Sequence, residues 1–251
     1  MSAQPSISAC VIARNEADEL AECLATLTWA DELVVVDDES IDDTVKVAGR
    51  FTTRVLVRAK GDDFAAQRNF ALDAATGEWV LFVDADERVS EALRDEIRAA
   101  VCAPAVDGYF LRRQDINFGY AFRYGESMRA PILRLARRKA GRFHGRVHET
   151  WRVGGPTRML QAPLQHYSHA DISAFLRKVD YQSSLAAVRL QDEGRGARAW
   201  ELLVYPLGNF FRNYLVHQGF RDGVAGLIYA ALMALHPLLA RAKRWERQQR
   251  P

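Results

Sequence analysis

The sequence predicts an α/β fold in which helices flank a mixed, mainly parallel sheet, followed by a C-terminal helical extension. Three observations support this. Short apolar runs alternate with helical patterns through the first 100 residues, strand-like runs then follow without helices between them, and only helical patterns remain after residue 171. Alternation of strands and helices is typical of right-handed βαβ units, which build a parallel sheet.

The elements follow from hydrophobic periodicity and flanking residues. Each expected strand of the first half is a short run of Val, Ile, Leu or Trp, and each helix repeats apolar residues at helical spacing. The expected strands are residues 7–13, 32–37, 54–58 and 79–84, and the expected helices are residues 17–27, 43–50, 64–74 and 90–101. Ser90 is a plausible N-cap of the last helix. Strands expected at residues 108–113, 130–137 and 147–153 break the alternation and indicate a mixed sheet edge.

Charge is unevenly distributed. The 251 residues carry a net charge of only +2, but residues 1–111 contain 10 Lys or Arg against 22 Asp or Glu, a net −12. Residues 112–146 contain 10 against 2, a net +8. An acidic half able to hold a cation therefore precedes a basic stretch suited to an anionic partner. The alternative for the basic stretch is an ordinary solvated face.

Two carboxylates, Asp84 and Asp86, lie at the carboxyl end of the strand expected at residues 79–84. Open α/β sheets bind ligands at this end of their strands, and hard oxygen ligands there suit Mg²⁺ or Mn²⁺ holding a diphosphate. A bare Asp-x-Asp is weak evidence, so the position of the pair carries the prediction.

Three further turns lie at equivalent places. Asp37 and Asp38 end the second strand, where their carboxylates suit a nucleobase imide or ribose hydroxyls, although capping of the next helix is the alternative. Residues 13–16 follow the first strand as a possible nucleotide-facing turn. Arg68 and Asn69 lie near the start of the helix before the Asp84 strand, where backbone N–H groups and the guanidinium suit a diphosphate. A surface Arg and a capping Asn are the alternative.

These turns together resemble the family 2 glycosyltransferases, whose nucleotide half has the GT-A (Rossmann-like) fold. The matching segments are Ile-Ala-Arg-Asn-Glu at 12–16, Val-Asp-Asp-Glu-Ser-Ile-Asp-Asp-Thr at 36–44, Ala-Gln-Arg-Asn at 66–69 and Asp-Ala-Asp at 84–86. Segments 143–149, 164–167 and 219–223 look like the lipopolysaccharide core glucosyltransferase-like branch. The resemblance therefore covers almost the whole chain.

The resemblance implies inverting transfer of a hexose, glucose in our expectation, from a UDP-sugar to a lipid-linked or lipopolysaccharide-core acceptor. It divides the chain into a nucleotide-sugar half (1–115), an acceptor and catalytic half of the same domain (116–170) and a membrane-associating helical region (171–251). The expected donor-binding residues are Ala13, Arg14, Asn15, Glu16, Asp37, Asp38, Arg68, Asn69, Asp84 and Ala85. The expected ligands of Mg²⁺ or Mn²⁺ are Asp84 and Asp86, with His148 and His166 as further candidates.

Glu149 is the candidate general base, because it is one of five acids between residues 147 and 200 and follows the start of an expected strand. Its alternative is a structural ion pair with Arg146 or Arg152. The alternative to a metal-ligand role for His148 and His166 is that each is a packed core residue.

The C-terminal region suggests a membrane surface. Leu207, Phe210, Phe211, Tyr214 and Leu215 follow helical spacing, and residues 224–240 carry no charge. This run is shorter than the ~20 residues of a spanning helix and contains Pro237, so we expect an interfacial or re-entrant segment on an anionic membrane. Packing on the core or in a dimer is the alternative.

With no secretory signal at the N-terminus, we expect a cytoplasmic protein, peripheral on the inner face of the membrane. Nucleic acid is not an expected partner. A catalytically silent GT-A-like module that binds an anionic lipid or polyanion through residues 112–146 is the alternative function. A nucleotidyltransferase, a third possibility, would be expected to have a Gly-rich first loop. Residues 12–16 contain no glycine, which argues against it.

Overall fold

The computed structural model describes residues 4–103, 105–125, 131–146, 149–193 and 198–249. The chain forms two compact units: unit 1 comprises Met1–Arg113 and Ala130–His166, and unit 2 comprises Gln114–Arg129 and Tyr167–Pro251. The chain passes between the units within strands β7 (Arg113–Asn117) and β13 (Leu164–His169). His148, a candidate metal ligand, lies outside the described residues.

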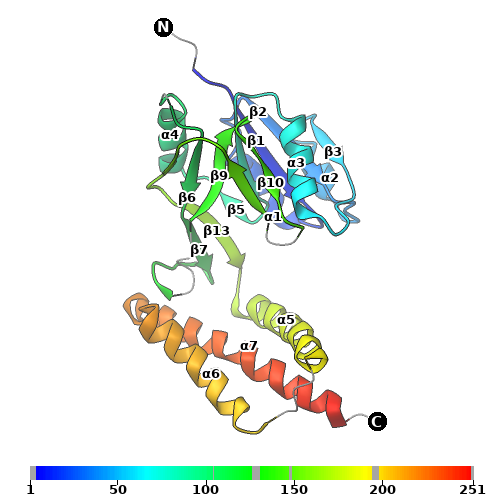
Figure 1. The fold of residues 1–251 in the computed structure, drawn as a ribbon, viewed down its shortest axis with the longest axis vertical. Helices are drawn as coiled ribbons and strands as arrows, with labels where there is room; N and C mark the ends of the chain where they lie inside the picture. Colours follow the sequence, from blue (N-terminus) through cyan, green and yellow to red (C-terminus); the bar gives the residue numbers. More distant parts are fainter. Residues whose placement is uncertain (1–3, 104, 126–130, 147–148, 194–197, 250–251) are drawn as a thin grey trace. The chain divides into compact units, whose positions relative to one another are not determined.

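Unit 1 is built on a seven-stranded sheet in the order β12-β6-β9-β4-β1-β2-β3 (Figure 1). Its strands are β1 (Ile7–Ala13), β2 (Glu32–Asp37), β3 (Val55–Val57), β4 (Trp79–Asp84), β6 (Gly108–Leu111), β9 (Ile132–Arg137) and β12 (Thr157–Met159). Neighbouring strands pair in parallel except at β9, which is antiparallel to both β4 and β6. The predicted mixed, mainly parallel sheet is confirmed.

Helices cover both faces of this sheet, which explains the uninterrupted apolar strands. They are α1 (Ala17–Ala25), α2 (Thr44–Ala48), α3 (Phe64–Ala74) and α4 (Glu91–Ala100). Successive side chains of β4 point to opposite faces of the sheet. Leu81 therefore packs in the buried cluster on one face and Phe82 in the cluster on the other. Ser90 caps α4 as predicted, since its Oγ accepts from the Leu93 N–H at 3.2 Å.

Several strands were not predicted because they are short or polar. They are β5 (Glu87–Arg88), β7, β8 (Tyr120–Ala121), β10 (Gly141–His144), β12 and β13. In unit 1, β10 pairs antiparallel with β11 (Thr150–Val153), and β13 pairs antiparallel with β5. The second pairing places His166 opposite Glu87, next in the chain to Asp86.

Unit 2 is largely helical, as the sequence after residue 171 predicts. Its long helices are α5 (Ile172–Asp192), α6 (Glu201–Phe211) and α7 (Gly223–Gln249), with a π-helical turn at Arg212–Val216 and a 3₁₀ turn at Gly219–Asp222. Helix α7 packs against both α5 and α6 (Figure 1). Residues 114–121, which include the antiparallel pair of β7 and β8, also belong to unit 2. Phe122, directly after β8, packs with Phe175 and Tyr229.

One helical stretch in the described part of the chain, Gly219–Gln249, is long and apolar enough to cross a membrane by length and composition alone. It contains Pro237. A core helix of a soluble protein passes the same test, so this stretch is weak evidence for a span.

Candidate active site

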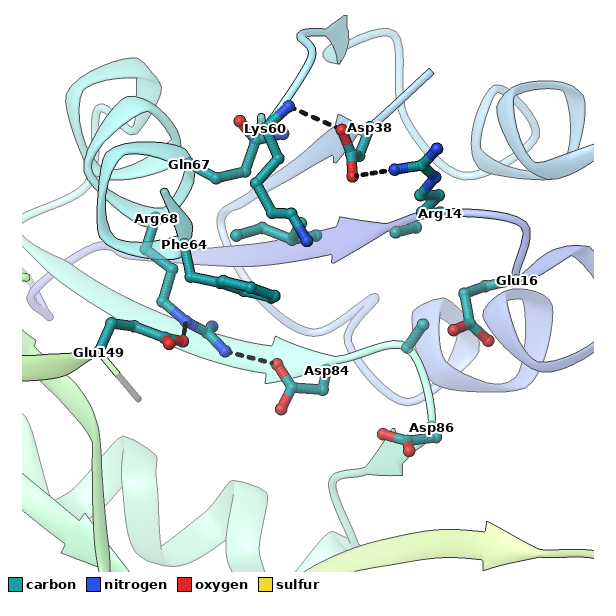
Figure 2. A pocket seen from close by; sticks show the side chains of 13 residues that line it. Arg14, Glu16, Asp38, Lys60, Phe64, Gln67, Arg68, Asp84, Asp86 and Glu149 are labelled. Carbon is teal, nitrogen blue, oxygen red and sulfur yellow. Dashed lines mark hydrogen bonds and ion pairs between the residues drawn. The ribbon is translucent and has the colours of Figure 1, made fainter. Parts of the chain in front are cut away.

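A cavity of about 460 Å³ opens in unit 1 beside the carboxyl ends of β1, β2 and β4 (Figure 2). This is the edge at which open α/β sheets bind ligands. The cavity is lined by Ile12, Ala13, Arg14, Glu16, Asp38, Lys60, Phe64, Gln67, Arg68, Asp84, Ala85, Asp86 and Glu149. Nine of the predicted site residues are thereby brought together from five separate segments.

Asp84, the last residue of β4, is held by two arginines. Arg68 Nη2 donates to Asp84 Oδ1 at 2.9 Å, and Arg134 binds both oxygens of the same carboxylate. Burial alone would raise the pKa of Asp84, but the Arg134 and Arg68 guanidiniums overcome it and hold that pKa well below the usual range. Asp84 is therefore an ionised anchor for Arg68, which lines the cavity, and for the buried Arg134.

Arg68 also binds Glu149, the candidate base. Its Nε donates to Glu149 Oε1 at 2.7 Å, so one guanidinium joins the end of β4 to the residue before β11 (Figure 2). The Arg68 and Glu149 side chains are only 12% and 14% exposed. Glu149 thus has an ion-pair partner other than the Arg146 or Arg152 of the structural alternative, and this partner faces the cavity.

Asp86 has a different neighbour. Its Oδ2 lies 3.1 Å from Nε2 of His166, whose side chain is 8% exposed. Adjacent ligands of an octahedral ion with bonds of about 2.1 Å lie about 3 Å apart, so this separation fits a shared Mg²⁺ or Mn²⁺. No group of three His, Cys, Asp or Glu side chains suited to a metal forms within the described segments. Phosphate oxygens and water would therefore complete the shell, as is usual for Mg²⁺.

The two acids at the end of β2 differ in position. Asp38 lines the cavity, accepting from Arg14 Nη1 at 3.3 Å and from the Lys60 N–H at 2.7 Å. Asp37 is 1% exposed, accepts from the Ser40 N–H at 2.9 Å and does not line the cavity. Asp38 is thus the acid placed to meet a ligand, while Asp37 shapes the turn.

Asn15 also shapes the protein. Its backbone is left-handed (φ 54°), its Oδ1 accepts from the Ile41 N–H at 2.9 Å, and its own N–H donates to Ser40 Oγ at 2.9 Å. These bonds tie the turn after β1 to the turn after β2. Ala13, Arg14 and Glu16 line the cavity, whereas Asn15 does not.

The Asn69 side chain forms hydrogen bonds to the protein backbone and does not line the cavity. Its amide donates to the Phe143 carbonyl and accepts from the Phe143 N–H, both at 2.9 Å. The suggested anion site on backbone N–H groups at the start of α3 also needs correction. The Ala66 N–H donates to Asp63 Oδ1 at 2.8 Å, and the Phe64 N–H donates to the Arg146 carbonyl at 3.1 Å. Only the Arg68 part of that expectation faces the cavity.

Lys60, Phe64 and Gln67 also line the cavity, although none of them was among the predicted site residues. Arg134 belongs to the basic stretch 112–146, for which an ordinary solvated face was the alternative. Arg134 is instead 8% exposed and lies within 3.6 Å of Glu87 as well as binding Asp84. Glu87 is fully buried, and burial raises its pKa above the usual value. The alternation of residues 132–137 was the available signal, since it places Arg134 on an inward-facing position of a strand.

Two further arginines of the basic stretch are paired with acids within unit 1. Arg137 pairs with Glu78, and Arg142 pairs with Asp73. The positive charge of residues 134–142 is therefore partly balanced by acids from other segments, which weakens the expectation of a polyanion-binding face.

Known proteins are similar to this chain over most of its length. Residues 8–178 match the sequence model described as Glycosyl transferase family 2. An uncharacterized glycosyltransferase of Rickettsia felis is 28% identical over 94% of this chain and 88% of its own length. The lipopolysaccharide core biosynthesis glycosyltransferase LpsC of Rhizobium meliloti is 27% identical over 96% of this chain and 92% of its own. The crystal structure of S. aureus TarS 1–349 aligns at 19% identity with a TM-score of 0.49, covering 96% of this chain and 88% of that one.

Proposed function

The chain belongs to glycosyl transferase family 2, and from this premise we propose that it transfers glucose, with inversion, from a UDP-sugar to a lipid-linked or lipopolysaccharide-core acceptor. The name of the R. meliloti relative, which spans nearly the whole chain, supports the lipopolysaccharide-core acceptor. The roles that we propose for individual residues in this reaction concern the cavity of unit 1.

One observation carries the proposal: Arg68 binds Asp84 at 2.9 Å and Glu149 at 2.7 Å in a single cavity. Inverting transfer needs a carboxylate that accepts the proton of the attacking hydroxyl on the face opposite the leaving group. Glu149 is that base in this proposal. Arg68 orients its carboxylate and, as a cation in the cavity, helps to bind the donor diphosphate.

Asp86 and His166 would hold Mg²⁺ or Mn²⁺, which supplies neutralisation of the negative charge on the departing diphosphate. Asp84 takes the supporting role of fixing Arg68 and Arg134. Arg68 and Lys60, which both line the cavity, add positive charge of the protein's own.

Asp38 would bind the base of the nucleotide. It lies at the end of β2, lines the cavity and uses one oxygen for Arg14 and the other for the Lys60 N–H. A carboxylate has about four lone-pair sites, so it retains capacity for an imide N–H such as that of uracil. This capacity supports a uridine donor.

A lipid-linked acceptor agrees with the exposed surface of α6 and the turn after it. Leu207, Phe211 and Leu215 are 54%, 50% and 53% exposed, while Asn213 on the opposite side is buried. An exposed apolar stripe of this kind suits the membrane interface. We therefore propose a peripheral enzyme on the inner face of the cell membrane.

The test is turnover of a panel of nucleotide sugars by the purified protein with Mn²⁺ and a lipopolysaccharide-core acceptor. UDP-glucose should give a glycosylated product by mass spectrometry. Glu149→Gln should lower kcat by about 10²- to 10⁴-fold, because the group that accepts the proton of the attacking hydroxyl is removed. Glu91→Gln, an exposed acid of α4, is the matched control and should keep full activity. Wild-type kcat in folded Glu149→Gln would eliminate the assigned base.

A further inference from the structure

A second cavity lies within the helical unit. Its volume is about 440 Å³, within the usual range for ligand pockets. Residues from the start of α6 and from the last third of α7 form it: Arg198, Ala199, Leu202, Arg241, Arg244 and Trp245. Three of these six are arginines, and no acid is among the described residues that line it.

Charge in the wall of this cavity is unbalanced. Arg244 is 1% exposed and pairs with Glu201 Oε2, and Arg241 Nε lies 3.7 Å from the same oxygen. The Nε atoms of both arginines are buried and have no hydrogen-bond partner among the residues that the structure describes. Two cations thus share one carboxylate oxygen, while Arg198 adds a third positive charge at the exposed edge. Because a buried charge is costly unless it is paired, an anion in the cavity would stabilise this arrangement.

The surroundings of the cavity are apolar and aromatic. Trp245 is 55% exposed at its edge, and Trp200, 48% exposed, stacks on Tyr205 with ring centroids 6.0 Å apart. Arg241 lies over the Tyr205 ring at 3.3 Å, which fixes the guanidinium. From here α6 continues into the stripe of Leu207 and Phe211. A cationic pocket at one end of an exposed apolar stripe suits an amphiphile with an anionic head.

We propose that this cavity binds the phosphate group of an anionic lipid. Guanidinium groups bind phosphate oxygens through paired, charge-assisted hydrogen bonds, and the three arginines supply such donors. The apolar stripe would contact the acyl region of the same bilayer. The site rests on the membrane association proposed above, but it does not depend on sugar transfer.

Vesicle flotation tests the site. Wild type should bind phosphatidylcholine vesicles containing phosphatidic acid more tightly than vesicles containing the same fraction of phosphatidylglycerol, whose phosphate is a less charged diester. Arg198→Glu should weaken binding to the phosphatidic acid vesicles by about tenfold, since a charge-assisted contact is replaced by repulsion. Arg198 is exposed, so the fold should persist.

Arg247→Glu is the matched control, because it makes the same charge change at an exposed position of α7 that does not line the cavity. It should lose much less affinity. Equal losses in the two variants, or no loss in Arg198→Glu, would overturn the site in favour of general surface charge.

Two further measurements test whether the bound phosphate comes from a lipid and whether the cavity acts independently of sugar transfer. Thermal stabilisation by glycerol phosphate that is lost in Arg198→Glu, without vesicle binding by wild type, would support the phosphate site and overturn its lipid source. Hydrolysis of the donor sugar should be unchanged in Arg198→Glu. Absence of that hydrolysis in wild type would contradict the proposed reaction and leave the vesicle result to decide the cavity.

Discussion

Two aspartates only two positions apart, Asp84 and Asp86, meet different partners. Asp84 contacts Arg68 and Arg134, whereas Asp86 lies 3.1 Å from His166. β4 ends at Asp84, so Asp86 lies in the turn that follows and is released from the two-residue period that would place both side chains on one face of the strand. The arginine-bound acid supports the cavity, and the acid beside the imidazole is the one that we propose as the metal ligand.

Replacement of the better ligand should therefore stop the reaction. Asp86→Asn should lower turnover at least about 100-fold and raise the Mn²⁺ concentration needed for half activity, because a charged ligand is lost. Its circular dichroism should match wild type, since the side chain is 35% exposed. Asp62→Asn, an exposed acid outside the cavity lining, is the control. Unchanged activity and Mn²⁺ dependence would remove Asp86 from the metal site.

Arg134 should matter for stability. Arg134→Met leaves the carboxylates of Asp84 and Glu87 with one cation fewer, and breaking such a pair should cost about 3 kcal/mol in the free energy of unfolding. This value lies at the lower end of the cost of breaking a buried ion pair, because the Asp84 side chain is 29% exposed. Arg142→Met, which removes a pair with Asp73 whose two side chains are 51% and 58% exposed, should cost at most about 1 kcal/mol in urea denaturation. Equal costs in the two variants would contradict the buried network.

At the scale of elements, strands β1, β2 and β4 and helix α3 occupy the residues that the periodicity predicts. Their signal was strong because each strand is apolar on both sides and each ends at a polar turn. β9 was predicted as a strand, but its insertion between β4 and β6 was not. This pairing brings Arg134 to Asp84, and it depends on tertiary packing that a local pattern does not encode. β13, with the sequence Leu-Gln-His-Tyr-Ser-His, is too polar to be recognised, so the approach of His166 to Asp86 was only a guess from residue type.

The attachment of β10 to α3 depends on Asn69. Asn69→Ala leaves both the N–H and the carbonyl of Phe143 without this partner, which should lower the free energy of unfolding by about 1–3 kcal/mol. The KM for the donor should change little, because Asn69 does not line the cavity. A large rise in KM at unchanged stability would restore the donor-binding role that the sequence suggested.

At the scale of the whole molecule, the sequence predicts a mixed, mainly parallel sheet first and helices last, and both are found. The apolar pattern of α6 was visible, but the sequence did not say which side faces solvent. The structure buries Asn213 beside Asn209 and exposes Leu207 and Phe211. Packing within unit 2 thus buries the Asn213 amide, whose Nδ2 donates to Asn209 Oδ1 at 2.6 Å, and leaves the apolar side exposed.

That exposed side should drive membrane binding. Leu207→Asp should weaken binding to anionic vesicles by about tenfold, since one leucine contributes about 1.5–3 kcal/mol when it leaves water. Leu185→Asp on α5 is a close control, because the two leucines are 53% and 54% exposed in the free protein. Binding should be retained in the control. Identical behaviour of both variants would contradict an interface on α6.

The central claim is that the carboxyl end of β4 holds a metal-bound nucleotide sugar beside Glu149. Anomalous scattering from crystals grown with Mn²⁺ and UDP measures this most directly. We predict one strong Mn²⁺ peak in contact with Asp86 and His166, with the diphosphate facing Arg68. A peak elsewhere, or UDP bound outside this cavity, would contradict the account.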